Sequence, residues 1–520
     1  MNSDSIQMLI AMVIYIVAIL GIGVYFLKIA NENSDNYFIG GRTLGPWVSA
    51  MSAEASDMSG WLLMGLPGVA YWCGLSDAFW TALGLAIGTY LNWKITAKRL
   101  RNYSVVAGDA ITIPEFFSNR FKENKKVILL IASVFILVFF TVYAASCFVT
   151  VGKLFHSLFG IQYQIVMIAG AFFVILYTLL GGFLAESVSD FMQGIIMIIA
   201  LILILVVGIA TSGGIGSVIE NAQSIPGFFD FFGIASPTVV DGVQQLSASG
   251  APLFGDALPY TFLTIISTMS WGLGYFGVPQ VLLRFIAIRD AAEIPKARRI
   301  ATTWCVISLF AAVIIGVIGR VLFPADLLTA SGAESIFITM STGLLPPLLA
   351  GFVMAGILAA TMSSSDSYLL IAASAFSKNI YEGILKKDAT EKQIMRVSHI
   401  TLIAVSIIGI IIALDETSII FKVVSFAWAG FGATFGPLML FSLFWKRTTR
   451  EGAIAGMLAG GGMVFIWRLL IKPLGGVFGI YELLPAFLVS CAFIVAVSLM
   501  TKEPSQEIQD EFEQAKAASI

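Results

Sequence analysis

Residues 55–60 read ASDMSG and lie inside one of the most apolar parts of the chain. Ala55 and Met58 are three positions apart, so their backbone carbonyls would converge if the helix unwinds after residue 58. The carbonyl end of a helix carries a partial negative charge and can ligate a small cation. Hard cations prefer oxygen ligands, so this stretch predicts half of a sodium site.

A second polar stretch, residues 356–370, reads GILAATMSSSDSYLL and offers further oxygen atoms. Ser363 and Ser364 follow Ala360 by three and four positions, which places their hydroxyls on the same helix face as the Ala360 carbonyl. Three neutral oxygens suit a monovalent ion. Serines in membrane helices also bond back to their own helix, and the sequence leaves that alternative open.

Aromatic residues at helical spacing indicate where a small organic substrate could bind. Trp271 and Tyr275 are separated by four positions, Pro279 follows one turn later, and Tyr143 lies in another apolar segment. An interrupted helix also frees backbone N–H groups, which can hold a substrate carboxylate. Because the chain contains 40 Phe, each ring taken alone is more typical of packing than of ligand binding.

Composition places these residues in a membrane. Of the 520 residues, 58% are hydrophobic and 12% are charged, whereas an average soluble domain carries about 25% charged residues. We therefore expect a membrane protein. The 30 basic and 32 acidic residues nearly balance, so no nucleic-acid partner is indicated. The four cysteines lack metal-ligand spacing and are expected to be small core residues.

A helix that crosses the membrane needs about 20 largely apolar residues. Thirteen segments qualify, which predicts an all-α, polytopic fold. Their approximate bounds are 6–27, 46–72, 76–97, 126–152, 160–182, 188–211, 259–283, 300–323, 345–377, 396–414, 418–445, 451–471 and 479–500.

The basic residues are distributed unevenly among the loops. With the N-terminus outside, 25 of the 30 lysines and arginines fall in or beside loops predicted to be cytoplasmic. The longest predicted outside segment, residues 212–258, contains no lysine or arginine. This asymmetry follows the positive-inside rule. It predicts an odd number of spans, with the N-terminus outside and the C-terminus in the cytoplasm.

Two of the predicted spans are interrupted by glycine and proline. The second contains SAEASDMSGWLLMGLPG and the seventh contains STMSWGLGYFGVPQ. They lie five spans apart, so spans 2–6 and 7–11 would form two repeats of opposite orientation. Paired interruptions of this kind indicate the binding site of a secondary transporter. The alternative is that these residues only allow close packing, which we expect for Gly84, Gly88, Gly452, Gly456 and Gly460.

Several of these motifs together resemble the sodium:solute symporter family, and most closely its bacterial proline-transporting branch. The resemblance runs from about residue 6 to residue 500 and is carried by these motifs: GGRTLGP (40–46), SAEASDMSGWLLMGLPG (52–68), WGLGYFGVPQ (271–280), ILAATMSSS (357–365) and AWAGFGATFGP (427–437). It implies thirteen helices with a LeuT-type core of two inverted five-helix repeats. It also implies uptake of L-proline driven by sodium through alternating access.

The resemblance assigns roles to individual residues. The sodium ligands would be the carbonyls of Ala55, Met58 and Ala360 and the hydroxyls of Ser363 and Ser364. Asp57 matches an aspartate that the family associates with sodium, and Ser59 and Gly60 match positions linked to coupling and substrate. The proline pocket would involve Tyr143, Trp271, Tyr275 and Pro279. Arg42 matches a coupling residue, and Asp190 matches an inner station for the released ion.

Two acidic residues depart from the pattern that the family leads us to expect. Glu54 and Asp366 stand where small or small polar residues are expected. Both leave open an altered ion preference or a contribution from protons. Neither replaces one of the five expected sodium ligands.

The expected organisation has six parts. These are a first helix with its loop (1–45), a first repeat (46–211), an outside loop (212–258), a second repeat (259–445), two last helices (446–500) and a cytoplasmic tail (501–520). We expect a multi-pass protein of the bacterial plasma (inner) membrane, without an obligate protein partner.

Other functions remain as alternatives. The same fold could carry pantothenate, a sugar or another amino acid. A membrane sensor is less favoured, because only about 20 residues follow the last span and some relatives fuse the core to a kinase module. A protease is disfavoured, since neither HExxH nor GxSxG occurs. We therefore expect a transporter and not an enzyme, with Na+ as the coupling ion.

Overall fold

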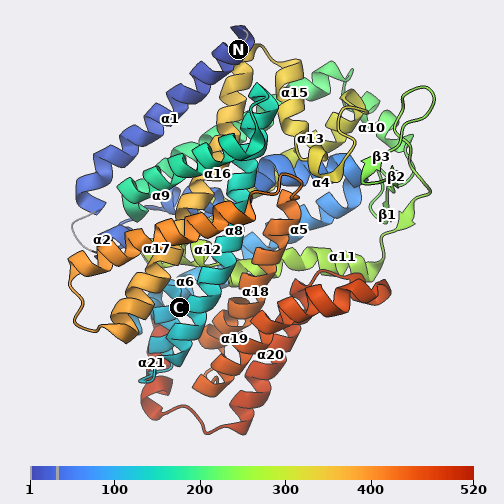
Figure 1. Cartoon of the computed structure of the whole chain (residues 1–520). Helices are drawn as coiled ribbons and strands as arrows, with labels where there is room; N and C mark the ends of the chain where they lie inside the picture. Colours follow the sequence, from blue (N-terminus) through green and yellow to red (C-terminus); the bar gives the residue numbers. More distant parts are fainter. Residues whose placement is uncertain (1–2, 31–33, 520) are drawn as a thin grey trace.

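The computed structural model describes residues 3–30 and 34–519 and is mostly helical (Figure 1). Among the described residues, ten segments are long and apolar enough to cross a membrane, judged by length and composition. They belong to nine helices, because α9 turns sharply at Gly182 (φ 59°) and contributes two segments. The nine are α1 (Ser3–Ala30), α8 (Val127–Phe159), α9 (Tyr163–Thr211), α13 (Ile294–Leu322), α16 (Pro347–Ser374), α17 (Glu391–Ile412), α18 (Ile420–Phe444), α19 (Arg450–Ile466) and α20 (Leu483–Met500).

The other three predicted spans are divided into shorter helices, so the count of thirteen is not confirmed by helix length. Span 46–72 consists of α3 (Pro46–Asp57), η2 (Trp61–Gly65) and α4 (Leu66–Cys73). Span 76–97 consists of α5 (Leu75–Leu91) and η3 (Asn92–Thr96). Span 259–283 consists of α11 (Phe262–Met269), η4 (Ser270–Phe276) and α12 (Pro279–Ala287). The predicted interruptions of the second and seventh spans are thereby confirmed.

Local sequence explains where several helices begin. Proline occupies the first turn of α3, α7 (Ile113–Arg120), α12, α13 and α16, where its missing N–H would have no intrahelical partner. At the start of α17, the Thr390 hydroxyl accepts a hydrogen bond from the backbone N–H of Gln393. The Gln393 side chain in turn accepts one from the backbone N–H of Thr390, which completes a capping box. These signals fix the helix starts independently of the apolar pattern.

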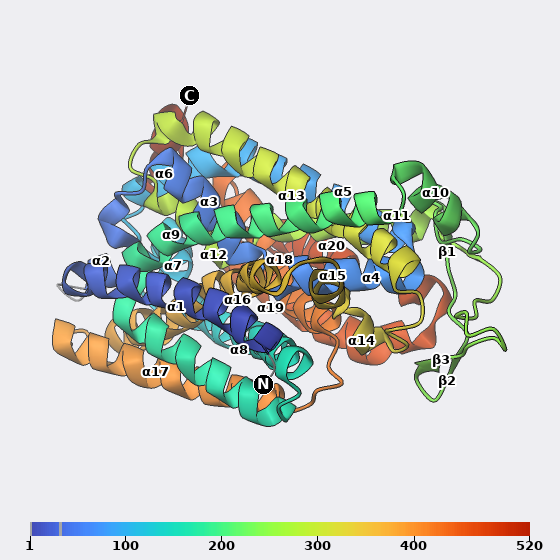
Figure 2. The ribbon, with the colours of Figure 1, turned by 90° about the horizontal axis from the view of Figure 1, so that it is seen from above.

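The centre of the molecule is formed by α16 together with α3, α8, α9 and α18 (Figures 1 and 2). Almost every residue of α16 from Ala350 onward is buried. This is expected of a helix that carries apolar or small residues on all of its faces. Helices α1 and α17 are peripheral and expose large apolar side chains such as Ile14, Val17 and Ile411. Such a surface fits contact with lipid.

Glycines bring α5 against the second interrupted segment. A methyl group on Gly88 would lie 2.3 Å from the carbonyl oxygen of Gly272, and one on Gly84 would lie 2.4 Å from that of Met269. No side chain fits these positions, so the predicted packing role of Gly84 and Gly88 is confirmed. Gly452, Gly456 and Gly460 likewise face neighbouring helices, at Ser498, Ile494 and Ala433.

The two ends of the helix bundle carry different short elements (Figure 2). At one end lie α10 (Ile215–Gln223), β1 (Gly233–Ile234), β2 (Val239–Val240) and β3 (Val243–Gln244), with β4 (Leu258–Pro259) paired to β1. The short helices α14 (Ala330–Ala333) and α15 (Ile336–Leu344) connect α13 to α16. Strand β1 pairs antiparallel with β4, and β2 with β3. At the other end lie α2 (Ser34–Ile39), η1 (Gly40–Arg42), α6 (Ala97–Val106), α7 (Ile113–Arg120) and the C-terminus.

The remaining short elements are η5 (Ala291–Glu293), η6 (Ala375–Leu385), η7 (Trp467–Ile471), η8 (Lys472–Leu474), η9 (Gly476–Gly479) and α21 (Gln506–Ala517). Helix α21 was not anticipated from the charged tail. Its Phe512 is buried against α6 and α7, with the Arg99 guanidinium 4.9 Å and the Arg120 guanidinium 5.3 Å from the ring centre. The tail therefore docks on the body of the protein.

Candidate functional site

The first interrupted segment breaks at the polar stretch that the sequence singles out. Helix α3 ends at Asp57, and Met58 leaves the helix with φ −88° and ψ 78°. The helix resumes at Trp61. Gly60 has no room for a side chain, because an added methyl group would lie 2.3 Å from Oγ1 of Thr150 on α8. The break is therefore held between α8 and the rest of the core.

Four of the five expected sodium ligands meet at this break. Ser363 and Ser364 on α16 both donate to the carbonyl of Ala55, at 2.8 and 3.2 Å. Ser363 also lies 3.2 Å from the carbonyl of Ala360. All four residues are buried. Met58, the fifth, lies at the break itself, where its N–H closes the last turn of α3 on the carbonyl of Glu54 at 2.9 Å.

The carboxylate of Asp57 is directed to the second interrupted segment. Its Oδ2 accepts from the Tyr275 hydroxyl at 2.8 Å, and its Oδ1 from the Gln280 amide at 3.5 Å. Its backbone carbonyl accepts from the Trp61 indole at 3.1 Å and from the Tyr143 hydroxyl at 3.4 Å. Asp57 thus connects both interrupted segments and α8, and Trp61 and Gln280 are contacts that sequence reasoning missed.

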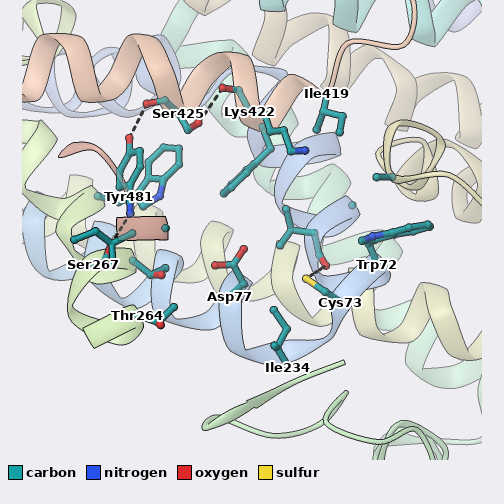
Figure 3. Close-up of a pocket in the computed structure, with 18 of the residues that line it drawn as sticks. Trp72, Cys73, Asp77, Ile234, Thr264, Ser267, Ile419, Lys422, Ser425 and Tyr481 are labelled. Carbon is teal, nitrogen blue, oxygen red and sulfur yellow. Dashed lines mark hydrogen bonds between the residues drawn. The ribbon is translucent and has the colours of Figure 1, made fainter. Parts of the chain in front are cut away.

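The four residues of the expected proline pocket do not line one common cavity. Tyr143 and Tyr275 meet at Asp57, and Tyr143 stacks on Tyr368 with ring centres 4.2 Å apart. Trp271 stacks on Tyr481 at 5.1 Å and lines a larger cavity (Figure 3). Pro279 lines a separate, narrow cavity. The structure therefore brings Tyr143 and Tyr275 together at Asp57, whereas Pro279 lines a cavity that neither tyrosine lines.

A buried charged cluster lies beside the first break. Arg284 of α12 contacts Glu186 and Ser367, and also donates to Asp190 at 3.3 Å and Ser52 at 3.0 Å. Ser52 donates to the same Asp190 oxygen at 2.7 Å. These residues come from α3, α9, α12 and α16. Sequence reasoning selected Asp190 but missed Arg284 and Glu186, because both fall just outside the predicted spans (160–182, 188–211 and 259–283), where a charge gives no functional signal.

Arg42 lies at the end of the bundle that carries α6. It donates to Ser104 at 3.0 Å, to the carbonyls of Ile286 at 3.1 Å and Ala110 at 2.9 Å, and pairs with Asp109 at 2.8 Å. Burial lowers the pKa of the Arg42 guanidinium, and Asp109 acts in the opposite direction. Because an arginine stays charged in proteins, Arg42 fixes α6 to the end of α12.

The two unexpected acids are both buried. Glu54 accepts from the Trp93 indole at 3.4 Å, and its other oxygen has no hydrogen-bond partner among the described residues. Asp366 accepts the backbone N–H of Ser367 at 2.8 Å, and its other oxygen likewise has none within residues 3–30 and 34–519. Neither carboxylate contacts the serine and carbonyl oxygens at Ala55.

A model of the sodium:solute symporter family matches residues 37–460. The chain belongs to this family. Curated sodium/proline symporters of Staphylococcus aureus strains USA300 and JH9 are each 40% identical to it over 516 residues, covering 98% of this chain and 96% of theirs. The family recognised from the sequence motifs is therefore confirmed, and the family and these relatives are transporters.

Solved structures show which fold this symporter shares. A substrate-bound, outward-open Na+-coupled sialic acid symporter superposes with a TM-score of 0.76 at 20% identity, covering 96% of this chain and 99% of the other. Mhp1, a nucleobase-cation-symport-1 family transporter, gives a TM-score of 0.53 at 11% identity, covering 92% and 98%. The predicted helical membrane fold of a secondary transporter is thus confirmed at the level of architecture.

Proposed function

We propose that this symporter couples the inward movement of Na+ to the uptake of L-proline across the bacterial plasma membrane by alternating access. The observation that carries the substrate is the 40% identity with S. aureus sodium/proline symporters over 98% of the chain. A family model that covers most of the chain supports sodium as the coupling ion. The protein forms no covalent intermediate in this process, so no catalytic residue is assigned.

The oxygen atoms around Ala55 form the proposed sodium site. The Ser363 and Ser364 hydroxyls already point at the Ala55 carbonyl. When Na+ binds among them, each hydroxyl turns its hydrogen away and offers a lone pair to the ion. Met58 at the break supplies the further carbonyl. Because the ligands come from α3 and α16, the ion holds the interrupted segment against α16.

The proposed proline site lies next to the same break. The Ser59 hydroxyl is buried and has no hydrogen-bond partner among the described residues, and buried polar groups normally have one. In the proposed site, Ser59 and the backbone at Gly60 receive the proline carboxylate. The ring would pack against Tyr143, Tyr275 and Trp271, and Pro279 would set the start of α12 below them.

Two buried ion pairs are suited to act as gates at the two ends. On the side of the larger cavity, Lys153 pairs with Glu334 at 2.8 Å, and Glu334 accepts the N–H groups of Ile420 and Phe421 at the start of α18. On the other side, Arg284 holds Glu186 and Asp190. Opening inward would separate the second pair, leaving Asp190 to receive the departing ion and Arg42 to transmit the movement.

We propose the topology that the charges predict. It has thirteen spans, with the three divided segments crossing the membrane together with the ten long ones, the N-terminus outside and the C-terminus in the cytoplasm. Residues 46–211 and 259–445 form the inverted repeats. The end with α10 and the strands then lies outside, and the end with α6 and α21 lies inside (Figure 2).

The driving force is sufficient for concentrative uptake. One charge moving through about 100 mV contributes about 2.3 kcal/mol. A tenfold sodium gradient adds about 1.4 kcal/mol, since that is one decade of an equilibrium constant. Together they support accumulation on the order of several hundredfold for each sodium ion.

The direct test is uptake of labelled L-proline by the full chain reconstituted in liposomes. We expect uptake with an inward sodium gradient, stimulated by a potential negative inside. Potassium or choline in place of sodium should abolish it. Uptake that does not depend on sodium contradicts the coupling. Sodium-dependent uptake of pantothenate, a sugar or another amino acid without uptake of proline contradicts the substrate.

A further inference from the structure

Two basic side chains from different helices lie on one aromatic ring. The Lys94 ammonium group is 5.5 Å and the Arg298 guanidinium 5.6 Å from the centre of the Tyr90 ring. Tyr90 is near the end of α5, Lys94 follows it in η3, and α13, which carries Arg298, packs against both elements. Cations are attracted to the face of an aromatic ring at such distances. These three side chains therefore form one group, which we call the Tyr90 cluster.

Neither cation of the Tyr90 cluster has an acidic partner. No carboxylate in the described part of the chain lies within ion-pair distance of Lys94 or Arg298. The acids that precede Arg298 in the sequence are engaged elsewhere, since Glu293 pairs with Arg289 and Asp290 accepts a backbone N–H in η5. Two like charges held close together repel each other, and an anion between them replaces this repulsion with attraction. The cluster is therefore complementary to an anion.

The Tyr90 cluster lies at the edge of the membrane-spanning region. It falls at the end of the predicted span 76–97 and just ahead of the predicted span 300–323. Ile87 and Leu91, which are next to Tyr90 on α5, expose large apolar side chains, as on a surface that faces lipid. Basic and aromatic side chains beside such a surface are typical of the boundary between lipid headgroups and acyl chains.

The chemistry of the cluster fits a phosphodiester group. An arginine offers a planar fork of donors to phosphate oxygens, and a lysine offers a compact charge. The Tyr90 hydroxyl has no hydrogen-bond partner among the described residues and is exposed, so it can donate to a further oxygen. Basic residues beside a membrane span attract anionic lipids, which carry a phosphodiester at this depth and acyl chains beside it.

We propose that the Tyr90 cluster binds the phosphodiester of an anionic phospholipid. The Arg298 and Lys94 side chains contact the phosphate oxygens, the Tyr90 hydroxyl donates to the headgroup, and the acyl chains lie along Ile87 and Leu91. Because Lys94 and Arg298 belong to different proposed repeats, one lipid joins the two repeats at the end of the bundle that carries α6. The inference is independent of which solute the symporter carries.

The test is native mass spectrometry of the purified full chain with added phosphatidylglycerol or phosphatidylcholine of identical acyl chains. We expect phosphatidylglycerol to bind more tightly. Lys94→Gln and Arg298→Gln should each weaken its binding by about fivefold, which corresponds to about 1 kcal/mol for one basic residue at a membrane surface. Phosphatidylcholine binding should not change. Lys94→Arg keeps the charge and should keep the affinity for phosphatidylglycerol.

Matched controls distinguish a defined site from general attraction to a basic surface. Lys296→Gln and Arg299→Gln each remove one exposed charge beside Arg298, outside the cluster, and should change the affinity for phosphatidylglycerol by less than about twofold. Equal losses in these variants and in Lys94→Gln would overturn the inference. Tyr90→Leu removes the ring that holds both cations and should weaken phosphatidylglycerol, whereas Tyr90→Phe keeps the ring and should weaken it less.

A last comparison separates a lipid from a free anion. Inorganic phosphate and glycerophosphoglycerol carry the phosphate without acyl chains, and neither should displace phosphatidylglycerol at an equal concentration. Displacement by inorganic phosphate would identify a soluble anion as the ligand and overturn the assignment to lipid. Unfolding temperatures of all variants without added lipid should match that of the unaltered chain, so that a loss of binding reports on the site and not on folding.

Discussion

The carboxylate of Asp57 accepts a hydrogen bond from the Tyr275 hydroxyl at 2.8 Å, which joins the two interrupted segments of the fold. Asp57 ends α3, and Tyr275 lies in η4 just ahead of the start of α12. In the same stretch, the carbonyl of Ala55 receives the two α16 serines. The residue that sets the position of the second segment is therefore two residues from a proposed sodium ligand, which gives ion binding a direct path to the substrate side.

Asp57→Asn should raise the sodium concentration needed for half-maximal proline uptake by about tenfold or more, because hydrogen bonds to charged groups are worth about 1.5–3 kcal/mol. The amide oxygen can still accept from Tyr275, so the variant tests the charge and should express normally. The measurement is sodium-dependent uptake in proteoliposomes. Tyr275→Phe is the control that keeps the charge, and it should lower the maximal rate more than the sodium affinity. An unchanged sodium requirement in Asp57→Asn would remove this carboxylate from the mechanism.

Ser363→Ala and Ser364→Ala should each weaken sodium binding before they weaken proline binding at saturating sodium. Each variant removes one oxygen that contacts the Ala55 carbonyl. A loss of about 1 kcal/mol for a neutral oxygen corresponds to roughly fivefold in affinity. Ser365→Ala is the matched control, because the Ser365 hydroxyl donates back to Thr361 on its own helix at 2.6 Å. Equal effects of all three substitutions on sodium affinity would contradict the assignment.

The two breaks and the grouping of Ser363 and Ser364 with the Ala360 carbonyl could be predicted from the sequence because their signals are local. Glycine and proline mark where a helix cannot continue, and serines three and four positions after Ala360 must share its face. The alternative that these serines bond only to their own helix is wrong for Ser363 and Ser364, which both reach Ala55. Helix spacing places the serines beside Ala360, whereas their meeting with Ala55 on α3 was expected only from the resemblance to the family.

The contacts between distant helices could not be predicted in this way. Arg284 and Glu186 lie just outside the predicted spans, they are 98 positions apart, and nothing local pairs them. The direction of the Asp57 side chain toward Tyr275, 218 positions away, likewise depends on how the two segments pack. The residues of one helix do not by themselves determine which other helix its polar side chains contact.

Gly60→Ala should abolish or strongly reduce uptake, because the new methyl group would lie 2.3 Å from Oγ1 and 2.5 Å from Cγ2 of Thr150. Forcing extra atoms into a packed site typically costs about 1–3 kcal/mol. Thr150→Ala in the same chain should restore part of the activity, and only part, since Cβ of residue 150 remains 2.8 Å away. The measurement is initial uptake rate normalised to protein in the membrane. Full activity of the single variant would show that the segment has more room than this packing allows.

Arg284→Gln should lower the thermal stability of the purified protein by removing the partner of two buried carboxylates, Glu186 and Asp190. Breaking a buried ion pair from one side costs about 3–5 kcal/mol. Adding Glu186→Gln should recover part of the loss, because one of the unpaired charges is then gone. Arg289→Gln removes an exposed pair with Glu293 and should leave the unfolding temperature almost unchanged. Equal unfolding temperatures for Arg284→Gln with and without Glu186→Gln would argue against a charge-balancing role for Arg284.

Phe512→Ala should detach α21 from α6 and lower the unfolding temperature, because the buried ring fills a space between Arg99, Arg120 and Tyr103. Removing a buried phenylalanine side chain costs about 3–5 kcal/mol. Gln514→Ala, on the exposed face of the same helix, is the control and should have almost no effect.

The docking of α21 can also be tested by pH. Glu511 of α21 forms a hydrogen bond with Lys122, which raises the pKa of Lys122 above its ordinary value of 10.5. A lysine whose pKa is raised in the folded state stabilises that state fully below its ordinary pKa, and this contribution is lost as the pH rises through the raised folded-state pKa. The docking of α21 should therefore persist through neutral and mildly alkaline pH, and release of the tail from the unaltered chain near pH 7, measured by limited proteolysis, would contradict the docked arrangement.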